Sequence, residues 1–165
     1  MFLKRLKLFF TAVTVLGTIF LIYSIYNTHK FKTSDLDEKT KNRINQKTIY
    51  LQSLAYRKFA VKRKIPIKIS NKLPSNLFGA ATFSQTGEIV IYLNKKRFKE
   101  SVDYMIEDVL PHEYAHALMF VFGDVSKENG GHSKKWQNIC KALEGKRCNR
   151  FVNHNDVIFD KTNLF

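Results

Sequence analysis

The chain has 165 residues, of which 44% are hydrophobic, and its 28 Lys and Arg against 14 Asp and Glu give a formal net charge of +14. This length allows one modest folded domain and excludes a multidomain enzyme, while the apolar content excludes a disordered chain. Two cysteines are too few for a disulfide scaffold or a four-cysteine zinc site, and the positive charge favours an anionic partner surface, either lipid or nucleic acid.

An uncharged apolar run without proline covers residues 8–26, which is long enough as a helix to cross the hydrocarbon core of a membrane. We therefore predict a basic tail and membrane anchor over residues 1–29 and a polar tether over 30–38. A cleaved signal peptide is the alternative, but no pair of small residues of the A-x-A type ends the run. The short basic tail favours a domain outside the cytoplasm, although bases flank both sides of the span and leave the orientation open.

The remaining residues, 39–165, are assigned to a single domain of the α+β class. Ser34 and Asp35 form a helix start signal, and apolar residues at helical spacing predict a helix from there through about Lys64.

Two β-prone runs, 78–84 and 88–94, flank a short connection that contains Gly87, which predicts a hairpin and an antiparallel sheet. The alternating run 65–69 contains Pro66 and predicts a short strand at a sheet edge or a strand start. Residues 101–110 return to helical spacing, and the Pro111 that follows either starts a new helix or kinks this one.

The motif H-E-x-x-H occupies residues 112–116 within a segment of helical pattern. Positions i and i+4 share one helix face, so His112 and His116 can present ring nitrogens to a single ion. Glu113 points to the side, where it can hydrogen-bond the attacking water and take its proton. That is the role of a general base in metal-assisted hydrolysis.

A third ligand is expected at His132, which follows two glycines and precedes a short helical segment. Trp136 lies one turn after His132 and is suited to anchor that segment in the core. Three of the five histidines thus predict a Zn²⁺ site.

Other polar residues are weaker candidates for the same site. His154 reads as a surface residue by default, with support of a ligand or contact with substrate as the alternative. The acids Glu107, Asp108 and Asp124 either support a histidine or lie on a solvated helix face.

At these motifs the sequence resembles the SprT-like family of zinc metallopeptidases, within the zincin fold. The resemblance runs in order over about residues 40–154 and is carried by the following segments: Phe78-Gly79-Ala80-Ala81, the strand 87–94, Val109-Leu110-Pro111-His112-Glu113 and Gly131-His132-Ser133-Lys134-Lys135-Trp136. It implies that His112, His116 and His132 bind zinc and that Glu113 is the base.

The resemblance has limits. Many members carry a cysteine-rich ribbon that helps engage DNA, whereas this sequence offers only Cys140 and Cys148, and it begins with an apparent membrane anchor. A role in DNA repair is therefore not carried over. A turn near Gly145 would bring the two cysteines within reach of a disulfide in an oxidising compartment, whereas in the cytosol they would remain thiols.

The leading hypothesis is a membrane-anchored zinc endopeptidase that acts on a protein or peptide substrate. We expect an edge strand around Ile89, Val90 and Ile91 to hold the substrate as an added strand. The alternative is a non-catalytic, zinc-stabilised module that binds anionic lipid, cell-wall polymer or nucleic acid. Glu113 favours the enzyme, because a purely structural metal site has no need of it.

Overall fold

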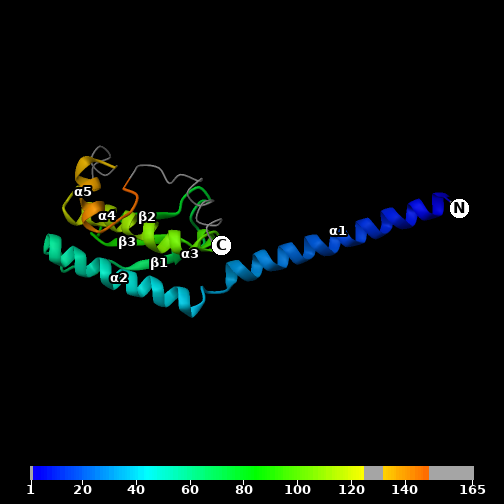
Figure 1. Cartoon of the computed structure of the whole chain (residues 1–165), viewed down its shortest axis with the longest axis horizontal. Coiled ribbons are helices and arrows are strands. Elements are labelled where there is room, and N and C mark those ends of the chain that lie inside the picture. Colours follow the sequence, from blue (N-terminus) through cyan, green and yellow to red (C-terminus); the bar gives the residue numbers. More distant parts are fainter. Residues whose placement is uncertain (1, 125–131, 149–165) are drawn as a thin grey trace. The chain divides into compact units, whose positions relative to one another are not determined.

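The computed structural model describes residues 2–124 and 132–148 and divides the chain into two compact units, Met1–Leu36 and Asp37–Phe165. The first unit is the helix α1 (Phe2–Thr33) (Figure 1). Its large apolar side chains are exposed along its length. Its residues Phe2–Phe31 are long and apolar enough to cross a membrane. The predicted helix is therefore present, and it continues beyond residue 29 into the expected tether.

The second unit is a mixed α+β domain. Its elements, in chain order, are α2 (Glu38–Phe59), β1 (Ile67–Ser70), β2 (Gly79–Phe83), β3 (Ile89–Asn94), the 3₁₀ helix η1 (Lys95–Lys99), α3 (Val102–Tyr104), the π-helix η2 (Met105–Val109), α4 (Leu110–Val121) and α5 (Lys134–Ala142).

Helix α2 begins at a side-chain cap three residues later than the predicted start signal at Ser34. The Asp37 carboxylate accepts hydrogen bonds from the Thr40 backbone N–H and hydroxyl, each at 2.8 Å. These bonds hold the pKa of Asp37 below its ordinary value. The helix ends at Phe59 rather than near Lys64, because Ala60 adopts the left-handed conformation (φ 55°) and closes the last turn.

The sheet has the strand order β1-β3-β2, so β3 is its central strand. The predicted hairpin of β2 and β3 is confirmed, with Gly87 at φ +81° in the turn. However, β1 pairs with β3 in parallel, which makes the sheet mixed rather than purely antiparallel. Parallel pairing requires a crossover between distant segments, and the local patterns used to predict the hairpin contain no information about it.

The prediction that Ile89, Val90 and Ile91 form a substrate-binding edge is wrong. These residues lie on β3, which pairs on both sides, and no more than 5% of each is exposed. The edges are β1 and β2, and α4 packs against both β2 and β3.

The segment that leads into α4 is continuous with it but contains a π turn. The Leu110 N–H donates to the carbonyl of Met105, five residues earlier in the chain. In a regular α-helix it would donate to the carbonyl four residues earlier. Pro111 follows the π turn in a run that is helical from Val102 to Val121, so it does not start a separate helix. Of the two alternatives for Pro111, the structure therefore favours an interruption within one helix, located at the π turn just before it.

Candidate metal centre

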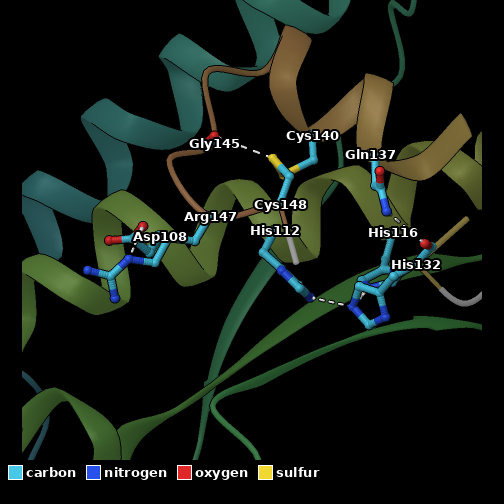
Figure 2. Close-up of a disulfide and its surroundings, with 9 residues drawn as sticks. All are labelled: Asp108, His112, His116, His132, Gln137, Cys140, Gly145, Arg147 and Cys148. Carbon is cyan, nitrogen blue, oxygen red and sulfur yellow. Dashed lines mark hydrogen bonds and ion pairs between the residues drawn. A yellow bond between two sulfur atoms is a disulfide. The ribbon is translucent and has the colours of Figure 1, made fainter. Parts of the chain in front are cut away.

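The histidines of the H-E-x-x-H motif project together from α4, as the helical spacing predicts. The ring centroids of His112 and His116 are 5.1 Å apart. His132 lies directly before α5, whose first turn is capped by Ser133. Figure 2 shows the His112 ring pointing toward the rings of His116 and His132. All three predicted ligands are therefore brought together.

The three rings converge through the same kind of atom. Nε2 of His132 lies 3.0 Å from Nε2 of His112 and 3.3 Å from Nε2 of His116. The candidate ligand atoms of the three histidines all lie within 4.8 Å of one another. Two nitrogens that each lie about 2.0–2.1 Å from one tetrahedral ion are about 3.3 Å apart, so this spacing fits a zinc ion.

The protonation state of His112 also fits a metal ligand. Burial, followed by the proximity of His132, lowers the pKa of His112 to about 4, while a hydrogen bond to the Arg147 backbone acts in the opposite direction. At neutral pH the ring is therefore neutral, with a lone pair on the nitrogen that faces His132. A divalent cation between the ring nitrogens would accept this lone pair and stabilise the arrangement.

Trp136 packs against the rings of all three histidines. Its ring centroid lies 4.6 Å from that of His112, 5.0 Å from that of His116 and 4.4 Å from that of His132. Trp136 is fully buried, as predicted for a residue that anchors α5 in the core. One aromatic side chain therefore fixes the positions of all three rings.

Glu113 is buried beside the cluster, with 8% of its surface exposed. Burial raises the pKa of Glu113 to about 7, and the hydrogen bond that its Oε2 accepts from the Ala81 N–H, at 3.1 Å, acts against this shift. A pKa near neutrality suits a group that must both take and return a proton.

Glycine at position 79 leaves room for the Glu113 side chain. A Cβ at Gly79 would lie 2.7 Å from Cγ of Glu113 and 3.2 Å from its carboxyl carbon. Neither this contact nor the role of the Ala81 N–H could be predicted from the sequence. Gly79 and Ala81 occur in a segment that carries the family resemblance, but neither residue type by itself indicates a role.

The weaker candidates have other partners or cannot be placed. Glu107 forms an ion pair with Lys47 on α2, and Asp124 forms one with Lys135 on α5. Asp108 lies 4.0 Å from the Arg147 guanidinium. His154 lies outside the described residues.

The two cysteines form a disulfide between α5 and the segment that follows it (Figure 2). Of the two alternatives left open by the sequence, the structure therefore has the bridge. Cys140 is fully buried and Cys148 is 7% exposed.

The SprT-like family model matches residues 27–156. The chain therefore belongs to the SprT-like family, whose general description is that of zinc metallopeptidases. The match covers the sheet, α4 and α5, and the histidine cluster fits the zinc-dependent protease that the family implies. No solved structure matches the chain.

Proposed function

We propose that this protein is a membrane-anchored zinc endopeptidase in which Glu113 is the general base. The observation that carries the proposal is the convergence of three Nε2 atoms next to a buried glutamate with a pKa of about 7. A purely structural zinc site closes its coordination with four protein ligands, whereas the cluster found among the described residues has three and leaves one position open.

His112, His116 and His132 would hold the zinc, which when bound supplies a Lewis acid that polarises the scissile carbonyl and activates water. Glu113 accepts the proton of the attacking water and returns it to the leaving amine. The Ala81 N–H orients the Glu113 carboxylate, and Trp136 keeps the three rings fixed.

The substrate strand would bind along the exposed edge of β2. The Ser84 N–H donates to the Glu88 carbonyl, and the Asn94 N–H donates to the Phe78 carbonyl. These two bonds determine which residues of β2 are hydrogen-bonded to β3 and which are not. Because alternate residues bond across an antiparallel ladder, the backbone groups of Gly79 and Phe83 and the carbonyl of Ala81 point away from β3, whereas the Ala81 N–H donates to Glu113. Pairing through this edge would recognise mainly the backbone of the substrate.

The disulfide supports a location for the domain outside the cytoplasm. Cystines persist in oxidising compartments and are rare in the cytosol. With α1 as the anchor, we infer that the short basic N-terminal tail lies on the cytoplasmic side of the membrane and that the domain lies on the opposite side. Reporter fusions at the C-terminus, active only on one side of the membrane, test this orientation, and a cytoplasmic signal contradicts it.

The mechanism is tested by Glu113→Gln in the full chain in detergent micelles. The amide side chain keeps an oxygen for the Ala81 N–H but cannot take a proton. We expect the zinc content to be unchanged and peptide hydrolysis to fall by about 10²–10⁴-fold. Equal hydrolysis by zinc-loaded wild type and variant would contradict the role of Glu113, and a loaded wild type that cleaves no peptide would favour the non-catalytic module.

A further inference from the structure

The segment that follows α5 returns to the metal centre and is closed by the disulfide. The Gly145 N–H donates to the Cys140 carbonyl at 2.9 Å, and the Gly145 carbonyl oxygen lies 3.3 Å from Sγ of Cys148. A Cβ at Gly145 would lie 2.7 Å from Sγ of Cys140. The turn is thus packed tightly around the bridge.

The residue before Cys148 contacts the metal centre through its backbone. His112 forms a hydrogen bond to the Arg147 backbone. Since Nε2 of His112 faces His132, the ring atom in this bond is Nδ1, whose N–H donates to the Arg147 carbonyl. Such a bond fixes both the tautomer and the orientation of a ligating imidazole.

The Arg147 side chain reaches the helical segment that precedes α4. Nε of Arg147 lies 4.0 Å from Oδ1 of Asp108, and its guanidinium carbon lies 5.6 Å from the ring centroid of Tyr104. These contacts belong to the side chain, whereas the covalent bridge at the neighbouring Cys148 constrains the backbone that carries the Arg147 carbonyl.

We propose that the Cys140–Cys148 disulfide is a positioning element for the metal ligand His112. It holds the Arg147 carbonyl at the hydrogen-bonding distance that orients the ring, so reduction of the bridge weakens metal binding. A phosphine reductant would pass two electrons to the cystine, and one water molecule would supply two protons and an oxygen atom, giving two cysteine thiols and the phosphine oxide. The inference rests on the proposed zinc centre.

The test uses the full chain in detergent micelles. The zinc dissociation constant is measured by competition with a chromophoric chelator, before reduction and after reduction with a phosphine that is removed by gel filtration under argon. Thiol titration checks the redox state. We expect reduction to weaken zinc binding by about 10–100-fold, the range seen when partners of metal ligands are lost. The visible spectrum of the cobalt-substituted protein should change as well.

Two variants separate positioning from general stabilisation. The double variant Cys140→Ser, Cys148→Ser should show the weaker zinc affinity without reductant and no further effect of reductant. Tyr50→Phe is the matched control. It removes a 2.7 Å hydrogen bond to Glu144, which lies between the two cysteines in the sequence, and it leaves the bridge intact. We expect Tyr50→Phe to bind zinc as wild type does.

The outcomes distinguish this inference from the proposed function. If the oxidised wild type binds no zinc, both fail. If the wild type binds zinc and cleaves peptides, but reduction leaves the zinc affinity unchanged, only the positioning role is overturned. It is also overturned if reduction abolishes the helical circular dichroism, because the bridge would then stabilise the whole domain. If the double variant does not fold, the reduced wild type alone decides.

Discussion

The backbone of Gly79 lies directly against the side chain of Glu113, and a single added carbon at position 79 would lie 2.7 Å from the glutamate Cγ. Gly79 begins β2 and Glu113 is in the first turn of α4, so the contact joins the edge strand to the helix that carries the metal ligands. The proposed base therefore has its position set by the strand that would bind the substrate.

We expect Gly79→Ala to impair catalysis without removing the metal. The new methyl group displaces the Glu113 carboxylate, because the three heavy atoms nearest to it all belong to Glu113. Peptide hydrolysis should fall by at least 10-fold, with kcat affected more than KM, while zinc content by elemental analysis stays at the wild-type level. Thr82→Ala, on the exposed part of the same strand, is the control and should retain activity. Wild-type kcat in Gly79→Ala would contradict the role of this contact.

Removal of zinc should lower the thermal stability of the wild-type domain. A ligand that binds only the folded state stabilises it by about 2.7 kcal/mol when its free concentration is one hundred times the dissociation constant. We expect a chelator to lower Tm for the wild type, measured by circular dichroism, and to leave Tm of His116→Ala unchanged. Equal Tm values of the wild type in excess zinc and in excess chelator would show that the three histidines bind no zinc.

Asn94→Ala should destabilise the domain. Asn94 is fully buried, and its amide donates to the Pro74 carbonyl at 3.0 Å and to the Leu77 carbonyl at 2.7 Å. In the variant these two carbonyls, in the loop that leads into β2, lose the amide donor. The free energy of unfolding should fall by about 1–3 kcal/mol. Urea denaturation measures the effect, and Asn138→Ala on the exposed side of α5 is the matched control. Equal stability of Asn94→Ala and wild type would contradict the bonding role.

The cap of α2 should give a pH-dependent difference between wild type and Asp37→Asn. Hydrogen bonds from Thr40 hold the pKa of Asp37 below 3.8, so the carboxylate stabilises the domain above that pH and loses its contribution as pH falls through the lower, folded-state value. The difference in the free energy of unfolding should be largest near neutrality and shrink below about pH 3.8. Asp37→Ser, which also caps without titrating, should behave as Asp37→Asn does. A difference independent of pH would contradict this account.

The residues of the metal centre could be predicted because their placement depends on local structure. Helical spacing alone puts His112 and His116 on one face. The hairpin of β2 and β3 could be predicted for the same reason, since a short connection with Gly87 joins adjacent strands.

The features that sequence analysis missed depend on contacts between distant segments. Because β1 pairs in parallel with β3, β3 is the central strand and β2 is an edge strand of the sheet. No pattern within β1 or β3 indicates this pairing. Backbone groups orient both Glu113 and His112, from Ala81 and Arg147 respectively. Every residue has an N–H and a carbonyl, so the identity of the residue gives no indication of such roles.

The π turn over Met105–Val109 holds one residue more than a regular α-helix would need over the same length. Because the Leu110 N–H bonds to the carbonyl five residues earlier, Leu110 takes the place that the fourth residue would otherwise have, and α4 keeps the direction of regular winding. Loss of one residue within the turn would therefore leave His112 and His116 facing His132. Insertion of a residue that no further π turn absorbs would rotate α4 by about 100° and separate the ligands, although every ligand remained in the sequence.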